Sequence, residues 1–354
     1  MLNTIKKNLW KLKQVQNYLY RMMLIPKALF ILLMGVYSSG YADYTSPHSE
    51  ASRQSSKKAV LEAIQRKMIP PELIGGGVYD SFKFNSTNST FYNRYYGHTK
   101  QGYLGGGNLY FHDVLTGVNV NSINTNVKSN SLLSSANAQI NNTNITNTSI
   151  NLYAMSMLSS YFSLQVLGGV GQSNSTINST LAFPGTTFPN TSGSASFDAF
   201  NEYIGGHAIF SRHYRKVMLQ GDIGYVFSNF EQPAYSIAYD DGATTQVLSL
   251  ITRIGLLTET ARISYQLYNN VQPFVTAGLI QVASRSFSNP VTPASATTAS
   301  PLPQLLIGNS GFDFGAGLVY QYKKLRLTPY YQYSQRGTNY FDNLGALNVS
   351  IVLN

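Results

Sequence analysis

Five histidines and a small set of acids and arginines are the residues of this sequence that could do chemistry. An imidazole beside a carboxylate or a hydroxyl can act as a general base for hydrolysis. The histidines are His48, His98, His112, His207 and His213. His112 has an adjacent acid in Asp113, but this pair falls in a predicted short turn. No nucleophile–base spacing, phosphate loop, metal signature or serine elbow is visible, so we expect no enzyme and no cofactor.

Other charged residues lie on successive predicted strands, where their side chains could point into the interior of a barrel. His207 lies within one predicted strand, Asp222 on the next and Arg253 on the one after, so these three side chains could form a charge-paired network. The candidate lumen-lining residues are Asp222, Arg253, Arg262, Asp313 and Arg326. They could line a pore and tune its ion selectivity. They could instead pair and fill a narrow lumen, which the interleaved signs favour.

Strands must hold these side chains, and period-2 alternation indicates strands. In "GFDFGAGLVYQY" (311–322), Phe312, Phe314 and Leu318 alternate with Asp313 and glycines. The segments 161–171, 218–227 and 325–334 alternate in the same way. One face is aromatic and aliphatic, and the other is polar. A soluble sandwich turns the apolar face to its core, whereas a membrane barrel turns it to lipid.

Twelve segments of this kind follow residue 88, each longer than the about 9–11 residues that a tilted strand needs to cross lipid. Within the eighth segment the apolar residues switch from even to odd numbers, which predicts a β-bulge near 257–260. The segments are 89–99, 101–112, 114–127, 145–158, 161–176, 197–212, 216–230, 246–268, 271–287, 309–323, 325–337 and 343–354.

The connections alternate between short and long, which is the layout of an outer-membrane barrel. The short ones are 112–114, 159–161, 212–216, 268–271 and 322–325, and the long ones are 128–144, 174–196, 231–245 and 288–308. Short outer loops near 97–102 and 336–342 are the exceptions. Tracts such as "NNTNITNTS" (141–149) are expected to be flexible surface loops. Both termini of the chain should face the periplasm.

The N-terminus predicts export. Six Lys and Arg residues without an acid precede the apolar run "ALFILLMGV" (28–36), and Gly40-Tyr41-Ala42 suits cleavage after Ala42. We therefore expect a signal peptide at 1–42, a periplasmic or lumenal tether at 43–84 and the barrel at 85–354. Within the tether, a short helix at 56–69 either plugs the pore or lies on the periplasmic side. Its shared apolar face consists of Val60, Leu61, Ile64 and Met68.

The composition supports a barrel in lipid. Only 11% of the residues are charged, against about 25% in soluble proteins, while 43% are hydrophobic and 13% aromatic. Without residues 1–42 the chain has 19 basic and 15 acidic residues, so its basicity does not indicate nucleic acid. The chain has no cysteine. Aromatics near strand ends suit interfacial girdles, among them Tyr95, Tyr96, Tyr110, Phe111, Tyr161, Tyr214, Tyr265, Tyr268, Tyr320, Tyr322, Tyr330, Tyr331 and Tyr333.

From about residue 85 the sequence resembles the autotransporter β-domain, the translocator of type V secretion. The resemblance rests on the strand count, on segments such as "GVGQS" and "GAGLVYQY", on "YNNVQPFVTAGL" and on the closing "GALNVSIVLN". It implies an all-β, transmembrane antiparallel barrel of about twelve strands in the bacterial outer membrane.

The function that the resemblance implies is a pore or translocator with little or no passenger. The alternative is a surface adhesin or binding module that displays its long loops on a closed barrel. The expected partners are outer-membrane lipid, the barrel-assembly machinery and either a small solute or a host surface ligand, with no nucleic acid.

Overall fold

The structure, a computed structural model, describes residues 71–87, 92–111, 114–132, 138–159, 161–183, 187, 189–288 and 308–353. Among them no helix is long and apolar enough to cross a lipid bilayer. Fourteen strands form one antiparallel sheet, and its strands are β1 (Glu72–Thr87), β2 (Tyr92–Phe111), β3 (Val114–Leu132), β4 (Ala138–Met157), β5 (Phe162–Ala182), β6 (Thr191–Tyr214), β7 (Val217–Gln232), β8 (Tyr235–Tyr239), β9 (Thr244–Val247), β10 (Leu250–Tyr265), β11 (Val271–Phe287), β12 (Ser310–Tyr322), β13 (Leu325–Arg336) and β14 (Tyr340–Val352).

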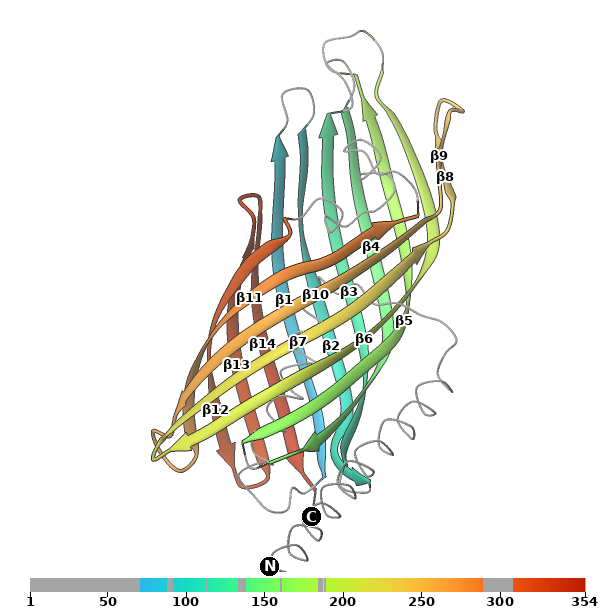
Figure 1. Cartoon of the computed structure of the whole chain (residues 1–354). Helices are drawn as coiled ribbons and strands as arrows, with labels where there is room; N and C mark the ends of the chain where they lie inside the picture. Colours follow the sequence, from blue (N-terminus) through green and yellow to red (C-terminus); the bar gives the residue numbers. More distant parts are fainter. Residues whose placement is uncertain are drawn as a thin grey trace, which may run out of the picture. The chain divides into compact units, whose positions relative to one another are not determined.

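Twelve of these strands close into a barrel (Figure 1). Each pairs with its neighbour in the chain, and β1 pairs with β14 from Glu72↔Val352 to Phe84↔Tyr340. The other two, β8 and β9, form a hairpin that pairs with β6 above the barrel wall. The predicted fold class and strand number are therefore confirmed. The predicted helix at 56–69 lies outside the described residues.

The connections separate into a turn end and a loop end. At the turn end, strands are joined by short turns such as 215–216 and 323–324, and there β1 begins and β14 ends. At the loop end lie the β8–β9 hairpin, the end of β11 and the start of β12. The short turns lie at one end as predicted, but two of the connections predicted to be long are mostly strand, since only 133–137 separates β3 from β4 and only 183–190 separates β5 from β6.

The first strand differs from the expectation. β1 lies within the range expected to be tether, and the segments 89–99 and 101–112 are one strand, β2, rather than two. Glycines explain both errors. Gly75 to Gly77 interrupt the apolar pattern of β1, and Gly97 and Gly102, which suggested a loop, lie within the continuous β1–β2 pairing.

Near the turn end, the outer face of the barrel is apolar. In β12, Phe314 and Tyr322 are exposed while Asp313 and Val319 are buried, as the alternation predicts. The outward residues of other strands are similar, for example Leu219, Ile223 and Tyr225 in β7. We call this continuous outward band the apolar belt.

Toward the loop end the outer face of β3 to β6 becomes polar. In β4, the outward residues change from Leu152 and Ile150 to Thr146 and Asn144, while Ile145 points inward and is buried. The tract 141–149 is therefore strand, not the flexible loop expected from its composition. Strands also occupy most of 128–144 and 174–196. The inner face of this part buries a few apolar side chains, such as Ile145, among many polar ones, such as Asn141, Thr143 and Asn147. Both faces are therefore largely polar, which is why the composition suggested a loop.

Two apolar clusters fill the loop-end part from the inside. One joins Phe82, Phe84, Tyr95, Val127, Ile145 and Tyr340. The other joins Ile177, Phe197 and Ala199 of the wall to Tyr235, Ile237, Tyr239 and Val247 at the hairpin. The rings of Phe197 and Tyr235 stack with their centroids 4.4 Å apart. These contacts hold the hairpin against β6.

The switch of apolar residues from even to odd numbers in β10 also arises because the apolar side chains change faces along the strand. Its pairing with β7 runs without a shift from Leu250 to Tyr265, so the even-numbered residues point inward throughout. Apolar side chains simply move from the inner face, at Leu250 and Ile254, to the outer face, at Ile263 and Tyr265. The bulge predicted near 257–260 instead lies at Gly255/Leu256, where β11 places one extra residue between Val282 and Ser284.

The aromatic residues divide between the two faces. Exposed tyrosines at the outer face or near the strand ends include Tyr96, Tyr161, Tyr214, Tyr265, Tyr268, Tyr322 and Tyr331. Tyr95 and Tyr330, which were expected in a girdle, are buried inside the barrel. Tyr95 in β2 and Tyr330 in β13 occupy positions whose side chains point inward. An aromatic side chain near a strand end therefore does not by itself indicate a girdle.

Candidate functional site: the charged lumen

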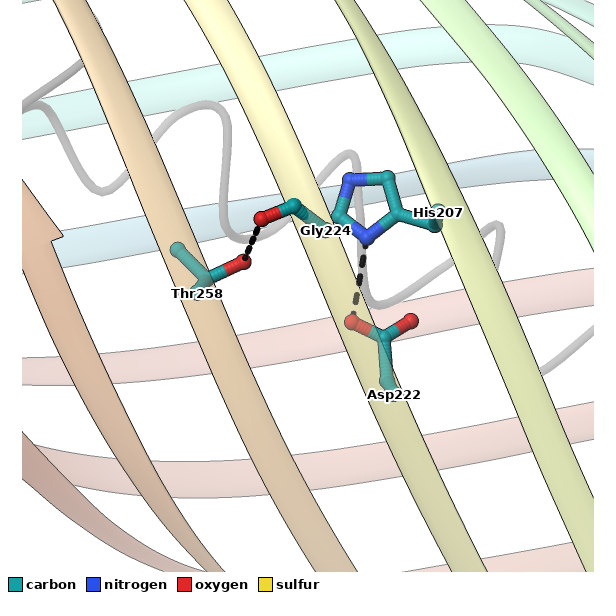
Figure 2. Close-up of polar contacts among 4 residues, drawn as sticks. All are labelled: His207, Asp222, Gly224 and Thr258. Atoms are coloured by element: carbon teal, nitrogen blue, oxygen red, sulfur yellow. Dashed lines mark hydrogen bonds and ion pairs between the residues drawn. The ribbon is translucent and has the colours of Figure 1, made fainter. Parts of the chain in front are cut away.

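His207 and Asp222 meet inside the barrel on neighbouring strands. The Nδ1 atom of His207 lies 3.0 Å from Oδ1 of Asp222, and both side chains are buried (Figure 2). β6 and β7 place them together because His207 is paired with Gly224, two residues along β7 from Asp222. Both therefore point inward. The carboxylate orients the imidazole ring within the wall.

Gly224 makes this contact possible. A Cβ atom built on Gly224 would lie 2.2 Å from the imidazole ring of His207, so only glycine lets the ring lie across β7. The hydroxyl of Thr258 on β10 donates to the carbonyl oxygen of Gly224 at 3.4 Å (Figure 2). This hydroxyl is directed at the backbone rather than at the imidazole. The arrangement thus builds a fixed polar contact across three strands.

A second pair joins the two ends of the barrel sheet. Nη1 of Arg326 on β13 lies 2.9 Å from Oε1 of Glu72 on β1, and both side chains are buried. β14 lies between them, and its Ser350 accepts a longer bond of 3.5 Å from the same nitrogen. The pair therefore spans the β1–β14 closure near the turn end.

Arg262 and Asp313 are the other predicted lumen residues on the inner face. The guanidinium carbon of Arg262 lies 3.7 Å from the ring centroid of Phe274, and its Nε donates to Ser264 at 3.2 Å. Asp313 is buried beside Gly278, where a Cβ atom would approach its carboxylate to 2.5 Å. Small and aromatic neighbours thus position these charges.

Arg253 does not join them. It is exposed between the buried residues Thr252 and Ile254, so it points to the outside of the barrel. The expected network of His207, Asp222 and Arg253 is therefore reduced to its first two members. The prediction failed because this half of β10 carries apolar residues on its inner face. The opposite face, which carries Arg253, was therefore interpreted as the lumenal one.

In the part of the chain that the structure describes, five inward charges escaped sequence reasoning: Glu72, Asp80, Arg285, Arg336 and Asp342. Asp80 and Asp342 lie on the paired strands β1 and β14, two register positions apart, and Asp342 accepts a bond of 3.3 Å from the hydroxyl of Tyr340. Arg336 continues the inward phase of β13 beyond Ser334. Asp80 lies an even number of residues from Ile74 and Val78. This alternation could have predicted that its side chain points inward. Asp342 was expected in a loop.

Apolar side chains separate these charges. Ile74, Val78, Tyr103, Phe274, Val319, Tyr330 and Leu344 form one inner cluster, and Tyr153, Leu167, Tyr203, Val226, Ile254, Leu256 and Ile280 form another. The lumen therefore holds charges of both signs among packed apolar groups. The plug-helix candidates Val60, Leu61, Ile64 and Met68 lie outside the described residues.

Comparison with known proteins identifies the fold. No protein-family model matches the chain, and no curated protein matches it in sequence. Among solved structures, it is similar to the translocator domain of the autotransporter NalP from Neisseria meningitidis, with a TM-score of 0.61 and 14% identity over 88% of this chain and 99% of that one. The predicted resemblance to autotransporter β-domains is thus confirmed at the level of the fold.

Two further solved structures match less closely. The β-domain of the Bordetella autotransporter BrkA gives a TM-score of 0.49 at 11% identity, over 79% of this chain and 99% of that one. The transport unit of the autotransporter AIDA-I from Escherichia coli gives 0.46 at 12% identity, over 84% of this chain and 98% of that one.

Proposed function

We propose that this chain is an outer-membrane barrel of the translocator type and that it acts as a pore. The observation that carries this proposal is the closed twelve-stranded wall with an apolar belt outside and charged groups inside. Closure leaves no unpaired strand edge in lipid, which a membrane requires. The proposal predicts solute passage along the axis and not a reaction.

The height of the belt agrees with a bilayer. In β7 the outward residues remain apolar from Val217 to Phe227, which rises about 25 Å at roughly 3.3 Å per residue and a tilt of roughly 40°. The hydrocarbon-facing band of outer-membrane barrels is also about 25 Å tall. The turn end would face the periplasm and the loop end the outside.

The lumen supports a role for the segment before β1. Residues 56–69 carry Lys57, Lys58, Arg66 and Lys67, and the inner wall carries acids such as Asp80, Asp313 and Asp342 as well as arginines. The inner apolar clusters favour entry of this segment into the lumen, with Val60, Leu61, Ile64 and Met68 packed against them. In this position it would restrict the pore.

Conductance tests the pore. The protein that starts at Asp43 is compared in planar bilayers with a version that starts at Glu72, the first residue of β1. Steady channels that widen on truncation are expected. Silence of both versions, when each is folded and heat-modifiable, would contradict the pore.

A second candidate function is a surface binding module. The β8–β9 hairpin and the strands that rise beyond the belt favour it, because they present a folded surface at the loop end. Such a module would not conduct. It would lose binding when residues 183–190 and 289–307 are shortened, whereas a pore would keep its conductance.

A further inference from the structure

The outer face of β3 to β6 beyond the apolar belt is a regular polar surface. It consists of the even-numbered residues of 122–130, 140–148, 172–180 and 192–198, and we call it the polar face. These side chains are exposed or half-buried. Apart from Ile140 they are Asn, Gln, Ser and Thr together with Lys128 and Asp198.

The polar face begins where the belt ends on the same strands. In β3 the change comes between Val120 and Ser122, and in β4 between Ile150 and Thr148. β5 changes between Val170 and Gln172. From Ser122 to Asn130 the strand climbs a further about 20 Å at a tilt of roughly 40°. A barrel seated by its belt therefore presents this face to the layer directly above the hydrocarbon.

The polar face is held in a fixed shape by the continuous pairing of its strands and by buried side chains behind it, a few apolar and many polar, such as Asn141 and Thr143. Val127, Ile145 and Ile177 point inward from β3, β4 and β5 and are buried. The strands pair in register, so that Asn126, Asn144 and Thr176 stand side by side. The outward side chains therefore have a fixed spacing. Less conformational entropy is lost when a ligand binds to such a preorganised surface.

The chemistry of this face matches neutral sugars. Amides and hydroxyls both donate and accept hydrogen bonds, as sugar hydroxyls do. Two cross-strand bonds already orient them: Asn126 donates to Asn144 at 2.6 Å, and Asn174 donates to Asp198 at 2.9 Å. One cation and one anion give the face no net charge, so phosphate or another anion has little to attract it. Solvent-facing protein surfaces normally carry many more charges.

We propose that the polar face binds the saccharide headgroups of glycolipid in the outer leaflet. The proposal rests on the membrane location in the proposed function. The polar face adjoins the apolar belt on the same strands, and this favours a glycolipid as its ligand. A glycolipid whose acyl chains lie along Ile150 places its sugars beside Thr146 and Asn144. The sugars would bridge neighbouring strands and stabilise the extension of the barrel.

The test compares two lipids that share their acyl chains and lipid A phosphates. The full chain is reconstituted into phosphatidylcholine vesicles that contain either lipopolysaccharide with its complete core oligosaccharide or lipid A alone. The midpoint of heat unfolding is followed as each lipid is increased, because a ligand of the folded state raises this midpoint. We expect a larger rise with the complete core than with lipid A, and equal rises would overturn the proposal.

Two matched double variants locate the effect. Asn126→Ala with Asn144→Ala removes one bonded pair from the polar face, and Ser236→Ala with Gln246→Ala removes an exposed pair bonded at 2.8 Å in the β8–β9 hairpin. The first variant should bind the core lipid at least fivefold more weakly, while the second should match the parent. Equal affinities of both variants and the parent would overturn the assignment to this face.

Failure of the proposed function has a separate signature. Heat-modifiability in phosphatidylcholine vesicles without glycolipid shows whether the barrel inserts. A chain that does not insert would contradict the membrane barrel itself. A chain that inserts and shows no sugar-dependent shift would contradict the saccharide proposal alone.

Discussion

Arg326 on β13 and Glu72 on β1 form a buried ion pair of 2.9 Å that reaches across β14. The pair links the strands on either side of β14, at the place where the first and last strands of the barrel meet. A closed barrel depends on this one non-sequential strand pairing, so its side-chain contacts should control closure. Removal of one partner of a buried pair leaves the other charge in a medium that solvates it poorly.

Arg326→Met should therefore destabilise the barrel by about 3–5 kcal/mol. The measurement is the urea concentration at which heat-modifiability is lost. Arg326→Met combined with Glu72→Met should recover most of the loss, because neither charge then remains buried. An unchanged midpoint in the single variant would show that the pair does not support closure.

Gly224→Ala should disrupt the His207–Asp222 contact. The added Cβ atom would lie 2.2 Å from the imidazole, and we expect a loss of about 1–3 kcal/mol from overpacking. Gly221→Ala on the same strand is the control, since no atom lies within 4 Å of its Cβ position. The double variant His207→Ala and Gly224→Ala should recover stability relative to Gly224→Ala. Equal effects at Gly224 and Gly221 would rule out this packing.

Glu259→Leu should stabilise the protein in lipid. Glu259 is exposed on the outer face of β10 and is paired with Ile223 and Leu279, so it lies within the apolar belt. The substitution should raise the free energy of unfolding in vesicles by on the order of 1 kcal/mol, since an acid on the lipid face is unfavourable. Glu231→Leu, at an exposed site in β7 beyond the belt, should have little effect. A loss of stability on Glu259→Leu would mean that the carboxylate contacts a polar partner there.

Phe197→Ala should release the β8–β9 hairpin without opening the barrel. Phe197 stacks on Tyr235 within the apolar cluster that holds this hairpin, and such truncations cost about 3–5 kcal/mol. Limited proteolysis should cut faster within 233–249, while heat-modifiability of the wall is retained. Phe200→Ala, three residues along β6 and only half-buried, should change the cleavage rate less. Equal cleavage rates would show that the cluster does not hold the hairpin.

Sequence reasoning succeeded where one polarity rule holds along a strand. The alternation in β12 and β13 predicted that Asp313 and Arg326 point inward and Phe314 and Tyr331 outward, because these strands lie mostly within the belt. The short turns followed from the same pattern, whereas the strand number was right because counting β2 as two segments offset the omission of β1. The chain order of the strands then determines their neighbours in an antiparallel barrel.

Sequence reasoning failed where the surroundings of a strand change along its length. Residues 141–144 were interpreted as loop because asparagine is rare in strands, although Asn141 and Thr143 are buried in β4. Arg253 read as lumenal because apolar side chains occupy the inner face of β10 at that height. A pattern of period 2 gives the two faces but not the medium that each face contacts. Only the neighbouring strands supply that information.

The outer face of β4 passes from lipid to water between Ile150 and Thr148, and spin labels test this transition most directly. Because the chain has no cysteine, single cysteines can be placed at Leu152, Ile150, Thr146 and Asn144 and labelled with a nitroxide in vesicles. We predict that labels at 152 and 150 are relaxed mainly by oxygen, and labels at 146 and 144 mainly by a water-soluble nickel chelate. Equal access of the nickel chelate at all four sites would contradict the account.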